Sequence, residues 1–456
     1  MSSIRRRKIM WRSALVAVVA VVAYALGQHY FEGPGICPQD PAACFFSDTY
    51  LVARRAFREG AQRLGAELHA LRVSESPDLT IDVAVLQPAL SSKPGKAPPT
   101  LIHMSGTHGV EAHAGSAAQL ALLQKWADEP ASAPMLKGVR VVLVHVVNPY
   151  GFHCGRRWNE LGADLNRNVL SDEDFAQLTS KDTERRALYD DHEWLFNWPR
   201  GWMPMTDDLL FLGNTIYGIV VKGFVNVKRA IVAGQYHRSD GLYYGGGPSM
   251  ARSHRLLLDL FRRVATPASA VVLIDVHTGL GPMGVDTLMP HLNPREKLDE
   301  ARNAEALHAI FGQPAGEGAS VLGVDYLIDA PNPSQASSSA ASSGYELARG
   351  STAEYVHHVQ GWQRTLHVTQ EFGTLPGPLV LRGLIIEKAE WLYHSPTAAA
   401  PGQCNGTAIG AKAARDAFYV RRRTWQERVV RRGVRLAEQA AHALAHTPER
   451  VPPREH

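Results

Sequence analysis

A histidine and a glutamate lie three residues apart in the segment SGTHGVEAHAGS, residues 105 to 116. An imidazole nitrogen and a carboxylate at this spacing can both reach one metal ion. Gly106 and Gly109 allow the backbone dihedral angles that such a tight turn needs. The pattern of His108 and Glu111 is weak by itself, because a chain of 456 residues can contain it by chance. A metal site therefore needs a third ligand from elsewhere.

The best third ligand is His277, which follows an apolar run in the segment IDVHTGLG. Asp275 or Thr278 could form a hydrogen bond to the ring of His277 and so orient it toward the metal. Two histidines and one glutamate with an open fourth position are the ligand set of catalytic rather than structural zinc. We therefore predict one zinc ion per chain, bound by His108, Glu111 and His277. The competing interpretation is that each histidine belongs to the core or to a turn.

A donor-rich loop forms the second signal, NPYGFHCGRRWNELGADLNRN at residues 148 to 168. Its three arginines, Arg156, Arg157 and Arg167, suit an anionic group, because a guanidinium presents a rigid fork to a carboxylate. Asn148, Asn159, Asn166 and Asn168 add further polar groups. A structural arginine network or a solvated loop is the alternative.

Glu371 in the segment TQEFGT places a carboxylate at the end of an apolar run. Beside a metal it could take a proton from water and later deliver it to a leaving amine. The alternative is a salt-bridged structural glutamate.

Strands must alternate with helices to position these residues. Alternating residues predict a half-exposed strand at 80–87, and apolar, β-branched runs predict strands at 100–105, 139–147, 269–276 and 364–370. Helical stretches are expected at 112–127, around 172–196, at 249–264 and at 298–311. This alternation predicts an α/β sandwich with a mostly parallel sheet. His108, Asn148, His277 and Glu371 each follow a predicted strand, and open α/β sheets bind ligands at that edge.

Two regions interrupt the pattern. Residues 170–240 contain Trp194, Trp198 and Trp202 and read as an insertion, either a lid over the site or an outer subdomain. Residues 332–344 are low in complexity and are expected to form a loop.

The two ends of the chain differ from its body. Arg5, Arg6 and Arg7 precede an uncharged run over residues 13–27, which is the order of a secretory signal, so the rest of the chain is expected to be exported. The segment 1–33 is either cleaved or kept as an anchor through residues 13–31, with the protein periplasmic or otherwise extracytoplasmic and, if the segment is uncleaved, in contact with the inner membrane. We expect a catalytic domain at 34–395 and a basic helical extension at 396–456, whose helix either packs on the domain or lies on a membrane.

The composition and the cysteine pattern argue against a nucleic-acid-binding protein and against a cysteine metal site. The chain is 45% hydrophobic and 20% charged, which is ordinary for a globular protein, and its net charge of +4 implies no nucleic-acid partner. Cys37 and Cys44 are close enough in sequence to close a small loop by a disulfide, and the four cysteines contain no C-x-x-C pair that would suit a metal.

Taken together in this order, the motifs over residues 45–395 resemble the zinc metallocarboxypeptidases, the carboxypeptidase A-like superfamily. Within it, SGTHGVE, NPYGF, RRWNE, DLNRN and DVHTGLG most resemble an uncharacterised bacterial branch that is metallopeptidase-like. The resemblance implies a mixed, mostly parallel sheet of about eight strands between helices. It also implies that His108, Glu111 and His277 bind zinc and that Glu371 is the general base.

The resemblance further implies roles for the substrate-facing residues. Arg157 or Arg156 would polarise the scissile carbonyl, and Asn166 with Arg167 would grip a terminal carboxylate of the substrate. A substrate-capping tyrosine has no secure match; Tyr326, Tyr345 and Tyr355 lie in the right interval, and Tyr345 is the preferred one.

The expected activity is hydrolysis of a peptide or peptide-like amide bond near a free carboxylate. One alternative is deacylation of an N-acyl amino acid, since the related aspartoacylase and succinylglutamate desuccinylase enzymes carry similar motifs. Another is a non-catalytic binding protein on the same fold. The expected partner is accordingly a peptide or an acyl amino acid that carries a carboxylate.

Overall fold

The computed structural model describes residues 34–75, 78–89, 97–290, 297–312, 327–328, 347–393, 404 and 409–454. The predicted signal or anchor at 1–33, the low-complexity segment 332–344 and Tyr345 lie outside the described residues. The expectations about them stay predictions.

The described residues form one mixed sheet of eight strands in the order β1-β2-β4-β3-β5-β8-β6-β7. The strands are β1 (Glu67–Ser74), β2 (Leu79–Leu86), β3 (Thr100–Ser105), β4 (Arg140–His145), β5 (Val271–Met283), β6 (Asp286–Pro290), β7 (Leu327–Ile328) and β8 (Thr365–Gly373). The central strands β4, β3, β5 and β8 pair in parallel, as do β6 and β7. The pairs β1-β2, β2-β4 and β6-β8 are antiparallel. The mixed α/β sheet is confirmed, and its continuous parallel part is limited to the centre, where the site residues lie.

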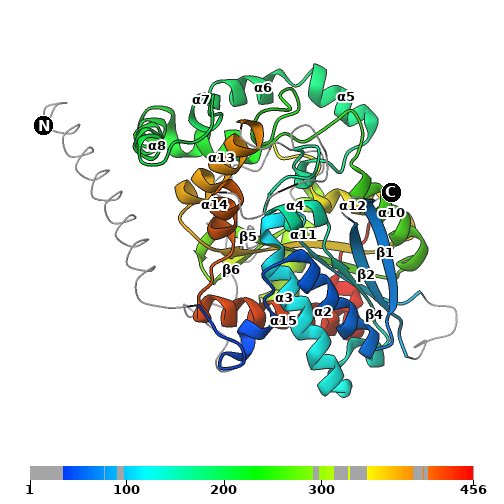
Figure 1. The fold of residues 1–456 in the computed structure, drawn as a ribbon. Coiled ribbons are helices and arrows are strands. Elements are labelled where there is room, and N and C mark those ends of the chain that lie inside the picture. Colours follow the sequence, from blue (N-terminus) through cyan, green and yellow to red (C-terminus); the bar gives the residue numbers. More distant parts are fainter. Residues whose placement is uncertain are drawn as a thin grey trace, which may run out of the picture.

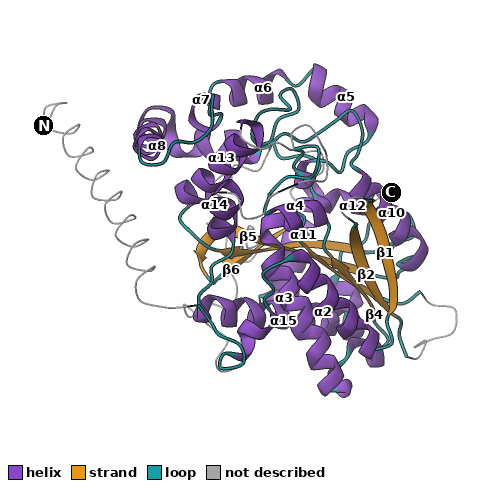
Figure 2. Cartoon of the chain, in the orientation of Figure 1, coloured by secondary structure: helices purple, strands orange, loops and turns teal. Residues whose placement is uncertain are grey.

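The helices surround this sheet, as Figures 1 and 2 show. They are α2 (Tyr50–Arg63), α3 (Ala112–Asp128), α4 (Pro149–Cys154), α5 (Asp172–Ser180), α6 (Thr183–Asp190), α7 (Glu193–Phe196), α8 (Thr206–Tyr217), α9 (Phe224–Val232), α10 (Arg252–Val264), α11 (Lys297–Phe311), α12 (Tyr355–His358), α13 (Gly377–Tyr393), α14 (Ile409–Phe418) and α15 (Arg423–His446). The helical stretch expected around 172–196 is three short helices, α5, α6 and α7. The elements that were not expected from the sequence are β1, β6, β7, α2, α4, α8, α9, α12 and α13. The single helix expected in the C-terminal extension is two helices, α14 and α15. Strand β2, expected to be half exposed, is buried along its whole length, since it lies between β1 and β4 in the sheet.

The central strands are buried on both faces, which explains their nearly continuous apolar sequence. Val141 and Leu143 of β4 pack in the core that contains residues of α2, α3, α11 and α15. Val142 and Val144 point to the opposite face and pack in a second core, which contains residues of α10. This alternation follows from the two-residue period of a strand.

The basic C-terminal helix α15 packs on the body of the protein. Trp425, Val429 and Leu436 are buried in the same core as the strands, and α15 contacts α3. The packed interpretation of this helix is confirmed over the membrane-lying one. Among the described residues no single helix has the length and apolar character to cross a bilayer, although the bent pair Thr206–Gly223 and Val225–Val232 meets these criteria jointly, with a bend of 107°.

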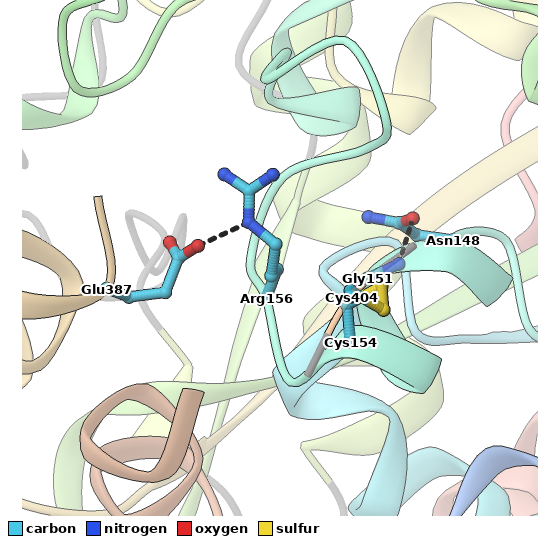
Figure 3. Close-up of a disulfide and its surroundings, with 6 residues drawn as sticks. All are labelled: Asn148, Gly151, Cys154, Arg156, Glu387 and Cys404. Carbon is cyan, nitrogen blue, oxygen red and sulfur yellow. Dashed lines mark hydrogen bonds and ion pairs between the residues drawn. A yellow bond between two sulfur atoms is a disulfide. The ribbon is translucent and has the colours of Figure 1, made fainter. Parts of the chain in front are cut away.

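Two disulfides cross-link parts of the chain that lie outside the sheet. Cys37 and Cys44 close the small loop that their spacing suggested. Cys154, the last residue of α4, is joined to Cys404, which is 250 residues away in sequence and shortly precedes α14 (Figure 3). The donor-rich loop after α4 is thus tied to the C-terminal helices.

Candidate metal centre

The turn after β3 brings His108 and Glu111 to one side of the sheet. Gly106 has a φ of +65°, which favours glycine. Gly109 is needed for a different reason than the expected dihedral freedom, because a Cβ there would lie 2.0 Å from the backbone carbon of Gly151. The 3₁₀ helix η2 (Gly109–Glu111) then turns Glu111 back toward His108.

His277 and Glu371 come from neighbouring parallel strands and are paired in register. Both strands run further than the sequence suggested, so these two residues lie within β5 and β8 rather than just after them. Along β8, Thr369 and Glu371 line the cavity described below, whereas Val368 and Phe372 point into the core on the other face. Strand alternation therefore places the histidine and the glutamate side by side.

Three ligand atoms converge from distant parts of the chain. Nδ1 of His108 lies 2.8 Å from Oε1 of Glu111, and Nδ1 of His277 lies 2.9 Å from its Oε2. The two Nδ1 atoms are 3.2 Å apart. All three residues are buried. Ligand atoms about 2.0–2.1 Å from a tetrahedral zinc ion are about 3.3 Å apart, so a small outward shift makes room for one ion.

The hydrogen bonds behind the two histidines leave the correct nitrogens for a metal. Nε2 of His108 is 3.0 Å from Oδ1 of Asp164, and Nε2 of His277 is 2.9 Å from Oδ2 of Asp275. An ionised carboxylate only accepts, so each Nε2 carries a proton. Each Nδ1 lies as close to the Glu111 carboxylate, which together with Asp275 raises the pKa of His277 well above its usual range although burial opposes this. When a cation replaces the proton on Nδ1, each ring presents a lone pair there. Two nitrogen lone pairs and the Glu111 carboxylate then face one point, which is a donor set for a cation.

The two supporting aspartates are themselves fixed by hydrogen bonds. Asp275 accepts from the hydroxyls of Thr107, at 3.0 Å, and of Thr352, at 2.6 Å. Asp164 accepts from Nε and Nη2 of Arg157, at 3.1 and 3.0 Å. Burial opposes the ionisation of Asp164, but the charges of Arg157, His108 and Arg167 together outweigh it and hold the pKa of this carboxyl well below its usual range.

The charges of this network also suit a divalent ion. Three buried carboxylates, those of Glu111, Asp164 and Asp275, surround the two histidines. Among the described residues, Arg157 is the one guanidinium in contact with them, at 3.1 Å from Oε1 of Glu111. With neutral histidines the network carries a charge of minus two, and a divalent cation would balance it.

Glu371 lines the same cavity and is poised between its two protonation states. Its Oε1 accepts a hydrogen bond of 2.9 Å from the backbone N–H of Leu280. Burial raises the pKa of Glu371 to about 7, and the negative charge of Glu111 adds to this effect, while His277 opposes it. A carboxyl group with a pKa near neutrality can both accept and donate a proton.

The structure separates the two adjacent arginines. Arg157 lines the cavity beside Glu111. Arg156 is buried elsewhere, where its Nε contacts Glu387 (Figure 3). Its guanidinium lies 4.2 Å above the ring of Trp391. Arg156 is not among the residues that line the cavity, so it stands outside the predicted site.

The predicted carboxylate-binding pair also lines the cavity. Arg167 donates to the backbone oxygen of Val232 through Nε and Nη2, at 3.0 and 2.6 Å, and to the backbone oxygen of Asn166 through Nη1, at 2.6 Å. Oδ1 of Asn166 accepts from the backbone N–H of Thr352, at 3.2 Å. The pair is therefore anchored on the 170–240 insertion and on the segment before α12.

The structure describes one of the three candidates for the capping tyrosine. Tyr345 and Tyr326 lie outside the described residues. Tyr355 is buried in the core, where its hydroxyl forms a hydrogen bond with Nδ1 of His254. Sequence reasoning missed Tyr243, which has a φ of +56°, lines the cavity and lies under the guanidinium of Arg157 at 5.9 Å. The glycine-rich segment GLYYGGGPS around it was the available signal.

A cavity of about 440 Å³ joins these groups to an apolar wall. The metal-ligand candidates, Glu371, Arg157, Asn166 and Arg167 line its polar part. The insertion lines the other part through apolar side chains, namely Leu195, Ile219, Val227, Ile231 and Val232, and Val380, Leu381, Leu384 and Phe418 join them. The insertion thus forms a wall of the cavity.

Comparison with known proteins identifies a family without an established function. The sequence model of a family described as a protein of unknown function, DUF2817, matches residues 46–432. No curated protein matches the chain.

Several solved structures are similar at low identity. A metallo-carboxypeptidase from Burkholderia cenocepacia is 13% identical, with a TM-score of 0.39 over 86% of this chain and 68% of its own. Thrombin activatable fibrinolysis inhibitor is 14% identical, with a TM-score of 0.41 over 88% and 75%. Carboxypeptidase A from Helicoverpa armigera is 12% identical, with a TM-score of 0.39 over 87% and 74%. Two of these names belong to the class that the motifs resemble, and the low scores leave the functional argument to the side chains of the site.

Proposed function

The chain belongs to the DUF2817 family, whose function is unknown, and we propose that it is a zinc-dependent hydrolase of a peptide or peptide-like amide bond near a free carboxylate. One observation carries the proposal. The Nδ1 atoms of His108 and His277 and the carboxylate of Glu111 converge on one point, with Glu371 in the same cavity.

The ligand set fits a catalytic ion. His108, Glu111 and His277 would hold the metal, and three protein ligands leave an open position. A divalent ion there would polarise an amide carbonyl and lower the pKa of bound water.

The residues of the chain divide the remaining chemistry between them. Glu371, with a pKa raised to about 7, accepts a proton from water and returns it to the leaving amine. A guanidinium has five N–H donors, of which Arg157 uses three in the contacts with Asp164 and Glu111. A further N–H of Arg157 can donate to the carbonyl oxygen as negative charge develops there.

Asn166 and Arg167 suit the carboxylate of the substrate. Both line the cavity, and the contacts of Arg167 with backbone oxygens hold its guanidinium in place. These contacts use three of the five N–H donors of Arg167, and the other two can donate to a carboxylate in a defined orientation, which would set the position of the amide bond.

The apolar wall keeps deacylation of an N-acyl amino acid as a second candidate. Side chains such as Val227 and Leu381 can accept an acyl chain as readily as an apolar amino-acid side chain. Both substrates carry the carboxylate and the amide that the polar part of the cavity suits.

A panel of peptides and N-acyl amino acids, assayed with the zinc-loaded protein, tests the proposal. We expect about one zinc ion per chain and hydrolysis of one class. Glu371→Gln should keep the metal and lose about 10²–10⁴-fold in turnover, because general-base catalysis is removed. Glu438→Gln, which alters a glutamate on α15 paired with Lys125, is the matched control and should keep full activity.

Each outcome decides between the candidates. Peptide cleavage supports the carboxypeptidase-type reaction, and cleavage restricted to acyl amino acids replaces it with deacylation. Tight binding of the panel without turnover would favour a non-catalytic binding protein. Undiminished turnover by Glu371→Gln would remove this residue as the base.

A further inference from the structure

The insertion carries an exposed apolar surface that the proposed reaction does not use. Ten of the eighteen large apolar side chains that are exposed among the described residues lie between Met203 and Val225. We call them the apolar patch; Met205 is 79% exposed, Leu209 72% and Val221 56%. The patch follows α8 and the π-helical turn Gly218–Gly223, and Figure 1 shows α8 at the periphery of the molecule. Such a concentration of exposed apolar side chains marks an interaction surface.

We propose that the apolar patch docks on the surface of a lipid bilayer. Residues 209–221 contain no charged side chain, and Tyr217 supplies the one polar group among the side chains of the patch. An interface between two proteins usually contains about one hydrogen bond per 100–200 Å² of interface area. The side chains of the patch have too few polar groups to form them. Contact with the hydrocarbon boundary of a bilayer requires no such hydrogen bonds from the side chains.

The charges around the patch suit anionic headgroups. Residues 200–232 contain four cations, Arg200, Lys222, Lys228 and Arg229, and two carboxylates. Both carboxylates are paired with arginines, Asp207 with Arg200 at 2.6 Å and Asp208 with Arg382 at 2.6 Å. The sequence of this region thus carries a net charge of plus two beside an apolar face, as in proteins that lie on anionic membranes.

The patch is continuous with the cavity. Ile219 is 38% exposed in the patch and also lines the cavity, and Val227 and Ile231 of α9 line the cavity from the same helical pair. The pair formed by residues 206–223 and 225–232 is bent by 107° and is together apolar enough for contact with lipid. Docking would place this opening of the cavity at the membrane surface.

A fluorophore at the patch tests the docking in the full chain. An environment-sensitive probe is attached to Leu209→Cys; the native cysteines are paired in disulfides and do not compete. On addition of phosphatidylcholine vesicles that contain phosphatidylglycerol, we expect a blue shift of the probe emission and quenching by brominated lipids. The matched control is a probe at Leu51→Cys on α2, 55% exposed and far from α8 in Figure 1, whose emission should not shift. The control also separates patch docking from mere recruitment of the chain by its N-terminal segment.

A second variant removes the apolar character without a change in the core. With the probe at Met205→Cys, the substitutions Leu209→Asp and Val221→Asp should abolish the blue shift, while circular dichroism stays unchanged because both side chains are exposed. The proposal is overturned if the probe at residue 209 does not respond to vesicles. It is also overturned if the probe is already buried without them and its burial grows with protein concentration, because a second copy then covers the patch.

Discussion

The Nδ1 atoms of His108 and His277 lie 3.2 Å apart although 169 residues separate them in sequence. Strands β3 and β5 are neighbours in the sheet and pair in parallel, so their carboxyl ends bring the two rings together. Glu111 closes the group from the turn after β3.

Removal of one ligand should remove the metal. We expect His277→Ala to bind zinc at least about 100-fold more weakly than the wild type, because two of the three ligands remain. His442→Ala, a change on α15 away from the cavity, is the control. Zinc content after dialysis against a chelator, measured by atomic emission, gives the result; an unchanged stoichiometry in His277→Ala would refute the assigned site.

The carboxylates behind the histidines should matter nearly as much. Asp275→Asn keeps the size of the side chain but weakens the hold on Nε2 of His277, now 2.9 Å away. We expect about a 10–100-fold loss of zinc affinity. Competition with a fluorescent zinc chelator measures it, and Asp259→Asn on the surface of α10 should leave the affinity unchanged. Equal affinities for Asp275→Asn and wild type would mean that this hydrogen bond does not orient the ring.

Titration of Glu371 should make the metal-free protein less stable as the pH rises. The pKa of this carboxyl is about 7 in the folded chain because of burial and of the charge of Glu111, against an ordinary value of 4.5. Between these values the folded state binds more protons than the unfolded state, so the stability from the neutral carboxyl is present below pH 4.5 and is lost as the pH rises through 7.

The comparison with Glu371→Gln isolates this effect. Between about pH 4.5 and pH 8 the wild type should lose on the order of 2 kcal/mol more unfolding free energy than the variant. Urea unfolding in the presence of a chelator measures both proteins. Equal losses of unfolding free energy in the wild type and in Glu371→Gln would show that Glu371 titrates with an ordinary pKa.

Close packing of the turn after β3 predicts opposite effects at two glycines. A Cβ on Gly109 would lie 2.0 Å from the backbone carbon of Gly151, so Gly109→Ala must displace the turn and should cost more than about 2 kcal/mol of stability and most of the zinc affinity. Gly213 of α8 has no atom within 4 Å of such a Cβ, and Gly213→Ala should stabilise the protein by up to about 1 kcal/mol. Thermal unfolding and zinc content distinguish the two.

Local patterns predicted the elements that are most regular. The apolar runs at 100–105 and 139–147 correspond to β3 and β4, and the helices expected at 112–127 and 298–311 correspond to α3 and α11. Strand β1 was missed because its residues are only partly buried and do not give a clear apolar pattern. Helix α13 was missed although Leu384 and Ile385 in it are buried, since an apolar helix in a core lacks a polar face.

The sequence by itself determined which residues could bind a metal. A histidine and a glutamate three residues apart in one turn can reach the same ion, so the pairing of His108 and Glu111 is a local signal. Only the tertiary structure decided which of two adjacent arginines faces the cavity, because Arg156 and Arg157 have the same chemistry and differ only in direction. The roles of Asp164 and Tyr243, and the wall formed by the insertion, likewise depend on contacts between segments far apart along the chain, which no local pattern records.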